Sequence, residues 1–166
     1  MENLHVEIVD RSEAKLNVAA ALEFVADPRF GGIANFVGRV REFNRDREVT
    51  GITYDLFEPL VLKTFREIGA RTLAEVGAPL KLWIAHAQGD LGLGDPAVVV
   101  AAGTPHRDEA FRACRLTIEA LKHEAPIWKQ EHYADGDSAW SEGCSLCDEH
   151  REAERAAAGF HGTDHG

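Results

Sequence analysis

Apolar residues recur along this chain with two different spacings. Alternation of apolar and polar residues, or a short apolar run bounded by Gly or Pro, is typical of a β-strand. These patterns predict strands at residues 4–9, 33–37, 49–57, 80–87 and 98–102. Apolar residues three and four positions apart predict amphipathic helices. This spacing occurs at residues 12–25, 59–76 and 105–124. Because the order is mixed, without strict strand–helix alternation, we expect an α+β fold: a largely antiparallel sheet with helices packed on it.

Polar and glycine-rich segments separate these elements. Residues 43–47 are polar and predict a loop. Residues 89–95, Gly-Asp-Leu-Gly-Leu-Gly-Asp, could cradle a phosphate or could form a turn between two strands. The segment lacks the Gly-Lys-Ser/Thr ending of a P-loop and the order of a dinucleotide-binding fingerprint. We therefore favour a turn between strands.

Composition and charge restrict the class of protein. A chain of 166 residues, 45% of them hydrophobic, has the size and composition of one globular domain. Its net charge of −10 argues against nucleic acids and anionic membranes as partners. The apolar runs are shorter than the ~18 residues of a membrane span. Residues 1–5 lack the features of a secretory signal, so we expect a cytoplasmic protein.

The basic residues are concentrated in two groups. The first group, within nine residues, is Arg39, Arg41, Arg45 and Arg47. The second group is His106, Arg107, Lys122 and Lys129. An acidic protein with concentrated basic residues fits a specific anionic ligand better than a long polyanion. The alternative is solvated surface charge, which is usual for an arbitrary Arg or Lys.

Two lysines lie near the end of the third predicted helix. Pro126 disfavours a helical conformation at the residue before it, so the helix is expected to end near Glu124 or Ala125. Lys122 then lies on the last helical turn, and Lys129 lies on the segment that folds away. Two ammonium groups brought together repel unless an anion lies between them, which predicts a phosphate or carboxylate ligand. The lysines could serve as acids, bases, nucleophiles or phosphate clamps, or could simply be solvated.

The start of the third predicted helix is a second candidate site. Thr104 suits the N-cap and Pro105 the first helical position. His106 and Arg107 follow, beside backbone N–H groups that are free at a helix N-terminus, which is an arrangement that can hold an anion. The alternative is that both side chains point to water. The apolar face of this helix is expected to bury Ala110, Phe111, Cys114, Ile118 and Leu121.

The length of this helix separates His106 and Arg107 from Lys122 and Lys129. From Arg107 to Lys122 a straight α-helix extends about 22 Å. One small ligand cannot readily touch both residues within one subunit. Either they serve separate sites, or a second subunit brings its helix start to the lysines of the first. The second option predicts a symmetric dimer with a shared active site.

The composition changes after residue 140. We expect one domain over residues 1–140 and a mobile tail over residues 141–166 that carries Cys and His. Three cysteines do not suggest a disulfide framework. Cys144, Cys147 and His150 resemble half of a zinc site, with His161 and His165 as further ligands. Because only one Cys pair is present, we favour adventitious binding or disorder and predict no metal site.

Several short motifs together resemble a known family. They are Gly38-Arg39-Val40-Arg41 with Asn44, His106-Arg107 at a helix start, Leu121-Lys122, and Pro126-Ile127-Trp128-Lys129-Gln130-Glu131. In order and spacing they resemble the large, catalytic subunit of molybdopterin synthase over about residues 4–140. The resemblance implies an αβ-hammerhead fold and a central homodimer. A ubiquitin-like sulfur carrier binds at each end of the dimer, which makes a heterotetramer.

The resemblance also implies the reaction and the residues that carry it. The carrier inserts a C-terminal Gly-Gly thiocarboxylate, and two sulfurs convert cyclic pyranopterin monophosphate (precursor Z) into molybdopterin, without a bound cofactor. Lys122 is the implied catalytic lysine, assisted by Lys129. The implied substrate-binding residues are Arg39, Val40, Arg41, His106, Arg107, Lys122, Lys129, Gln130 and Glu131. Gln130 departs from the family, in which a basic residue is frequent there. The family pattern also includes a basic residue in its C-terminal part. No residue here matches it clearly, although Arg151 or Arg155 could fill the role.

Two other hypotheses belong to different functional classes. A non-catalytic module could bind the sulfur carrier or a pterin without turnover, but such a module would not need both Lys122 and Lys129. A zinc-dependent regulatory protein would use Cys144 and Cys147 and would purify with stoichiometric zinc.

Overall fold

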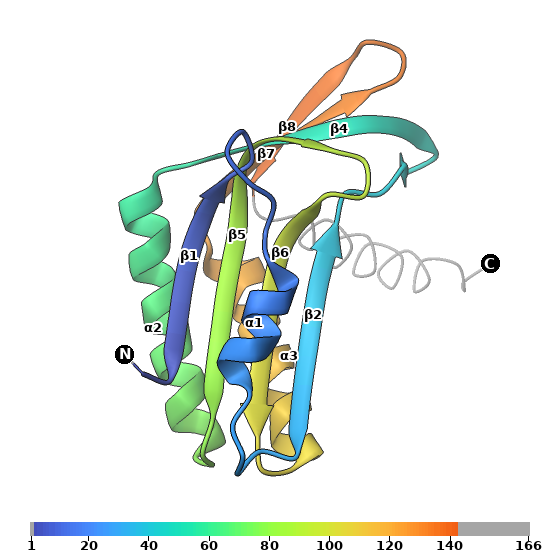
Figure 1. Ribbon diagram of the computed structural model, residues 1–166. Helices are drawn as coiled ribbons and strands as arrows, with labels where there is room; N and C mark the ends of the chain where they lie inside the picture. Colours follow the sequence, from blue (N-terminus) through green and yellow to red (C-terminus); the bar gives the residue numbers. More distant parts are fainter. Residues whose placement is uncertain (1, 143–166) are drawn as a thin grey trace, which may run out of the picture.

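The computed structural model describes residues 2–142 as eight strands and three helices (Figure 1). The strands are β1 (Leu4–Asp10), β2 (Gly32–Arg39), β3 (Phe43–Asn44), β4 (Arg47–Leu56), β5 (Lys81–Gly92), β6 (Pro96–Thr104), β7 (Ile127–Tyr133) and β8 (Ser138–Glu142). The helices are α1 (Val18–Val25), α2 (Glu58–Val76) and α3 (Arg107–Glu124). The predicted tail lies outside these residues from 143 onward.

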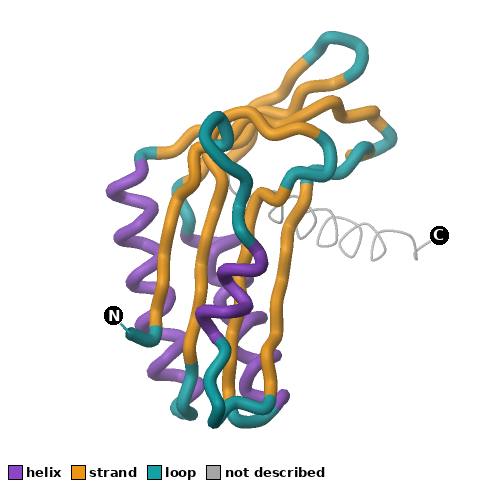
Figure 2. The backbone as a smooth tube through the Cα atoms, in the orientation of Figure 1, coloured by secondary structure: helices purple, strands orange, loops and turns teal. Residues whose placement is uncertain are grey.

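The strands form one sheet in the order β2-β6-β5-β4-β7-β8. The pairings along this path are antiparallel, whereas β1 lies parallel to β5. The long strand β5 pairs with β6 over its first half and with β4 over residues 89–92. It therefore joins the helix-covered part of the sheet to the β4–β7–β8 extension, which projects beyond the helices (Figures 1 and 2). The prediction of an α+β fold is confirmed.

Helices cover both faces of the β2–β6–β5–β1 part of the sheet. α1 lies on one face, and α2 and α3 lie on the other (Figure 1). Strand β6 is consequently buried on both sides, and residues 97–102 are all at most 1% exposed. A strand covered on both faces reads as a continuous apolar run rather than an alternating one. None of the helices described between residues 2 and 142 is long and apolar enough to cross a membrane.

Several predictions about individual elements need correction, and two of them concern the first half of the chain. The first helix is short because it begins after Asn17, whose side chain caps it by accepting a hydrogen bond from the Ala20 N–H at 3.0 Å. The polar loop at 43–47 is a tight hairpin between β3 and β4. Its two turn residues, Arg45 and Asp46, have positive φ angles of 52° and 61°. This left-handed conformation lets two strands reverse over two residues.

Two further corrections concern α3. The predicted N-cap Thr104 is the last residue of β6, and His106 caps the helix without a side-chain hydrogen bond. The Thr104 hydroxyl instead donates to the His106 carbonyl oxygen at 2.6 Å. Phe111 is not in the core, since 64% of it is exposed. The predicted core residue Cys114 is buried, and burial raises the pKa of its thiol to about 11, which makes it unreactive.

His86 on β5 makes the stability of the fold depend on pH. The ring is 1% exposed, packs edge-on against Tyr54 at 4.8 Å, and donates from Nδ1 to the Ala87 carbonyl oxygen at 2.7 Å. Burial lowers the pKa of His86 from 6.5 to about 4. Because the unfolded chain binds this proton more readily, stability is lost as the pH falls from about 6.5 to 4.

Urea unfolding measured at pH 7 and at pH 4.5 is expected to show this loss. The contribution of His86 is about 3 kcal/mol, from the difference between the two pKa values. A His86→Leu variant should lose less stability over this interval than the wild type. The control His123→Gln, at a half-exposed position on α3, should behave as the wild type. Equal losses in the wild type and His86→Leu would contradict the assignment.

Candidate functional site

Strand β7 places two charged side chains on the inner face of the β4–β7 pair. Lys129 lies opposite Tyr54, and Glu131 lies opposite Ile52. The side chains of Lys129 and Glu131 are only 2% and 8% exposed, and Lys129 Nζ lies 3.4 Å from Glu131 Oε1. Alternation along the strand puts Trp128 on the other face, where it is 46% exposed. The core here therefore contains a buried ion pair.

Glu131 is held by two further side chains. The Asn44 amide nitrogen lies 2.9 Å and 2.8 Å from the two carboxylate oxygens and donates to them. The Tyr133 hydroxyl donates to Oε2 at 3.0 Å. Burial and this hydrogen bond to Glu131 raise the pKa of the Tyr133 phenol. Asn44 reaches Glu131 because the β3–β4 hairpin folds back beside β7. In the sequence, Asn44 was part of the motif with residues 38–41, but no role could be predicted for it. No sequence pattern predicted that Tyr133 would contact the site.

The arginines at the end of β2 diverge. Arg41 Nη2 lies 3.5 Å from the Asn44 side-chain oxygen, so Arg41 extends the cluster of Lys129, Glu131 and Asn44. Arg39 turns away and donates from Nε to the Gly94 carbonyl oxygen at 2.9 Å, at the turn between β5 and β6. The irregular pairing between Gly38 and Arg39 breaks the strand alternation here.

The side chains of Val40 and Gln130 also lie outside the cluster of Lys129, Glu131 and Asn44. Val40 is 3% exposed and pairs through its backbone with Gly94 and Asp95. This contact fixes the turn between β5 and β6. It is a turn between strands as expected, but it comprises only residues 93–95, because residues 89–92 of the predicted turn continue β5. Gln130 faces the side of β7 opposite Lys129, and its amide nitrogen donates to Ser138 Oγ at 2.9 Å. The structure therefore brings together Arg41, Lys129 and Glu131 from the predicted set, but not Arg39, Val40 or Gln130.

Lys122 lies on the last turn of α3, which ends at Glu124 as the proline predicted. Its side chain is partly buried. Only Ala125 and Pro126 separate the helix from β7, so Lys122 and Lys129 lie on either side of one short connection. The Ala125 N–H donates to the Leu121 carbonyl oxygen at 3.0 Å, which fixes where the chain leaves the helix.

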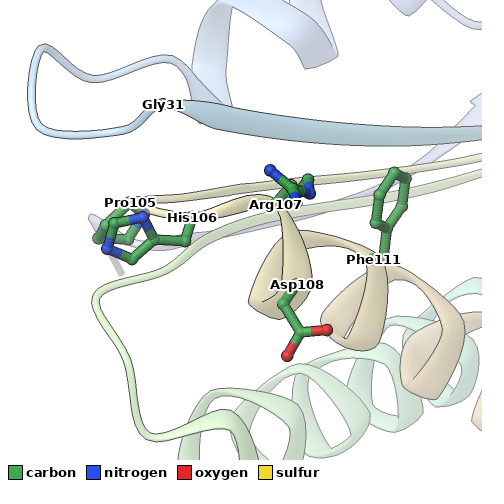
Figure 3. A pocket seen from close by; sticks show the side chains of 6 residues that line it. All are labelled: Gly31, Pro105, His106, Arg107, Asp108 and Phe111. Atoms are coloured by element: carbon green, nitrogen blue, oxygen red, sulfur yellow. The ribbon is translucent and has the colours of Figure 1, made fainter.

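His106 and Arg107 line an open pocket of about 690 Å³ at the other end of α3. Gly31, Pro105, Asp108 and Phe111 complete its lining (Figure 3). Arg107 and Phe111 point to the same side of the helix, and Asp108 points to the other (Figure 3). Gly32 lets β2 approach closely, since a Cβ there would lie 3.0 Å from the Arg107 backbone. The pocket combines a guanidinium, an imidazole and an aromatic ring, which suits a planar anionic ligand.

The His106–Arg107 pair and the Lys122–Lys129 pair therefore lie at opposite ends of α3. α3 runs without a break from Arg107 to Glu124, so the separation expected from its length holds within one subunit. No cluster of His, Cys, Asp or Glu that could hold a metal ion occurs among residues 2–142. The predicted Cys and His ligands, together with Arg151 and Arg155, lie outside the described residues.

Comparisons with known proteins agree on one family. The model of the MoaE protein family matches residues 11–124. The molybdopterin synthase catalytic subunit of Synechococcus elongatus is 47% identical over 147 residues, covering 89% of each chain. The molybdopterin synthase catalytic subunit 1 of Mycobacterium tuberculosis is 41% identical over 125 residues, covering 75% of this chain and 84% of the relative.

Solved structures show the same similarity. A crystal structure of molybdopterin synthase from Staphylococcus aureus superimposes with a TM-score of 0.75 at 30% identity, covering 81% of this chain and 95% of that one. A complex of subunits 1 and 2 of the molybdopterin-converting factor from Helicobacter pylori contains a chain that superimposes with a TM-score of 0.63 at 25% identity. This match covers 83% of the present chain and 89% of that chain.

Proposed function

This chain belongs to the MoaE family of molybdopterin synthase catalytic subunits, and from that membership we propose how its residues perform the reaction. The enzyme acts in molybdenum cofactor biosynthesis. It transfers two sulfurs from a thiocarboxylated ubiquitin-like carrier to cyclic pyranopterin monophosphate. The observation that supports a catalytic reading most directly is the placement of Lys122 and the buried Lys129 on either side of the α3–β7 connection.

Cations suit every stage of this reaction. The carrier thiocarboxylate, the cyclic phosphate and the phosphate that forms when the ring opens are all anions. Fixed positive groups in a poorly solvated site stabilise negative charge better than mobile water does, because they need no reorganisation. We assign the catalytic role to Lys122, with Lys129 assisting and with Arg41 and Glu131 completing the wall of the site. Arg39, Val40 and Gln130 shape that wall from outside the cluster, through the β5–β6 turn and the β7–β8 pair.

The family and the length of α3 support a proposal for the partners. The Helicobacter pylori complex supports a small-subunit partner for this chain. We propose that the carrier tail enters beside Lys122. We also propose that a second copy of this chain brings its His106–Arg107 pocket to that site, because α3 separates Arg107 from Lys122 within one subunit. The pocket would bind the phosphate of the pterin. Residues 1–140 would form the catalytic domain.

The proposal is tested by a conversion assay with the wild-type protein. The protein, a thiocarboxylated carrier and cyclic pyranopterin monophosphate are combined, and the dithiolene product is measured. Formation of product supports the assignment. A folded protein that binds the carrier but forms no product would contradict it and would favour the non-catalytic binding module.

A mixing experiment tests whether two subunits share each site. The variants Arg107→Ala and Lys122→Ala should each be nearly inactive alone. After subunits exchange, half of the dimers contain one of each, and one of their two sites is intact. Activity should therefore recover to about 25% of the wild-type value. An unchanged, low activity after demonstrated subunit exchange would show that both residues act within one subunit.

A further inference from the structure

Asn44 occupies a position between two charged groups that need opposite hydrogen-bonding partners. Its amide nitrogen faces both oxygens of Glu131 at 2.9 Å and 2.8 Å. Its amide oxygen faces the Arg41 guanidinium at 3.5 Å. A carboxylate accepts hydrogen bonds and a guanidinium only donates them. Both neighbours therefore favour the same orientation of the amide, with its nitrogen toward Glu131 and its oxygen toward Arg41. An aspartate has the same shape but would set a second carboxylate against Glu131.

The Lys129–Glu131 pair depends on such support. The two residues lie on one face of β7, and their side chains are 2% and 8% exposed. Burying two charges is strongly unfavourable unless the remaining lone pairs are also satisfied by hydrogen bonds. Asn44 and Tyr133 supply these hydrogen bonds to the Glu131 carboxylate. Because Asn44 contacts both oxygens, it restricts the rotation of the Glu131 carboxylate. It thereby also restricts the position of the Lys129 ammonium, which pairs with that carboxylate.

We infer that Asn44 is a positioning residue of the synthase reaction. It acts through Glu131 to hold the Lys129 ammonium, and it links this ion pair to Arg41. The residue comes from the β3–β4 hairpin, whereas the ion pair comes from β7, so the contact also joins the hairpin to the site. The catalytic consequence rests on the proposed role of Lys129. The placement of the Lys129 ammonium does not depend on that proposed role, and it can be measured without turnover.

The first measurement follows the placement of Lys129 by chemical labelling of lysine amines, read by peptide mass spectrometry. In the wild type Lys129 should react slowly because it is buried. In Asn44→Ala its rate should rise by about tenfold or more, because loss of a charged hydrogen bond frees the Glu131 carboxylate. Lys63 on α2, with a side chain 72% exposed, provides an internal reference that should not change. The matched control Asn35→Ala, at an exposed position on β2, should label as the wild type.

The second measurement is turnover. Asn44→Ala and Asn44→Asp should lower kcat by about tenfold, whereas KM for the pterin phosphate should change by less than about threefold, because a 3.5 Å contact holds Arg41 only weakly. In a Glu131→Gln background, the additional change Asn44→Ala should alter kcat by less than about twofold, because Asn44 acts through Glu131.

The outcomes separate this inference from the proposed function. Unchanged Lys129 labelling in Asn44→Ala would overturn the inference. The inference would also be overturned if Asn44→Ala lowered kcat by the same factor in the Glu131→Gln background as in the wild type. Faster labelling without loss of kcat would support the positioning of the ammonium and contradict a catalytic role for Lys129. Faster labelling of Lys81 on β5 as well, whose side chain is only 24% exposed, would show general unfolding and would overturn a local role for Asn44.

Discussion

Replacing Lys122 by alanine is expected to lower turnover by about 10²- to 10⁴-fold, the range over which a positioned proton donor or acceptor contributes. Lys122 lies on the last turn of α3, directly before the connection to β7 and the buried Lys129. The measurement is a single-turnover conversion assay at saturating carrier, with carrier affinity determined separately. Affinity should fall far less than turnover. Lys63→Ala, at an exposed position on α2, is the matched control and should convert at the wild-type rate.

The variant Lys122→Arg distinguishes the chemical roles open to this lysine. Arginine keeps the positive charge but does not release its proton in proteins and does not form the covalent intermediates available to an amine. Activity retained in Lys122→Arg would indicate charge stabilisation. Activity lost in both variants would indicate proton transfer or covalent catalysis. Turnover of Lys122→Ala within about tenfold of the wild type would contradict a catalytic role.

Replacing Glu131 by leucine is expected to lower the free energy of unfolding by about 3–5 kcal/mol, because removal of one partner leaves a buried charge uncompensated. Lys129 is that charge, since its side chain is 2% exposed and its Nζ lies 3.4 Å from Glu131 Oε1. The measurement is urea unfolding at pH 7. A loss below about 1 kcal/mol would show that Lys129 reaches water or another anion once Glu131 is removed.

The double variant Lys129→Met/Glu131→Leu separates stability from catalysis. Two apolar side chains of similar size leave no buried charge, and such exchanges are often neutral or stabilising. The double variant should therefore unfold near the wild-type urea concentration, yet its turnover should stay low because the proposed assisting lysine is absent. Wild-type turnover in this variant would assign the ion pair a purely structural role.

The elements that were predicted correctly have local signals. The apolar run of residues 98–102 identified β6, and Pro126 located the end of α3. Strand β7 was missed because its alternation is inverted. Its charged residues Lys129 and Glu131 point inward on the same side as Ile127, and its large aromatic side chain, Trp128, points outward. A rule that places apolar residues in the core cannot detect such a strand.

The candidate site was predictable only where residues close in sequence define it. The Lys122–Lys129 segment and the His106–Arg107 helix start were found from their positions beside Pro126 and Pro105. The Asn44–Glu131 contact joins residues 87 positions apart, and no periodicity carries that information. Phe111 was assigned to the core from its helical spacing, but it lines the open pocket beside Arg107.

The strand pairing has a consequence for how the chain folds during synthesis. β1 is made first but pairs with β5, so Leu4 has no partner until Leu82 has left the ribosome. β2 is completed later still, because Gly32 pairs with Thr104 on β6. Pairing between residues so distant in sequence closes long loops and slows folding. Until then the nascent chain carries two apolar strands without partners. A chaperone that binds extended apolar segments should therefore capture chains stalled before Thr104 has left the ribosome, and should release chains in which Thr104 has emerged.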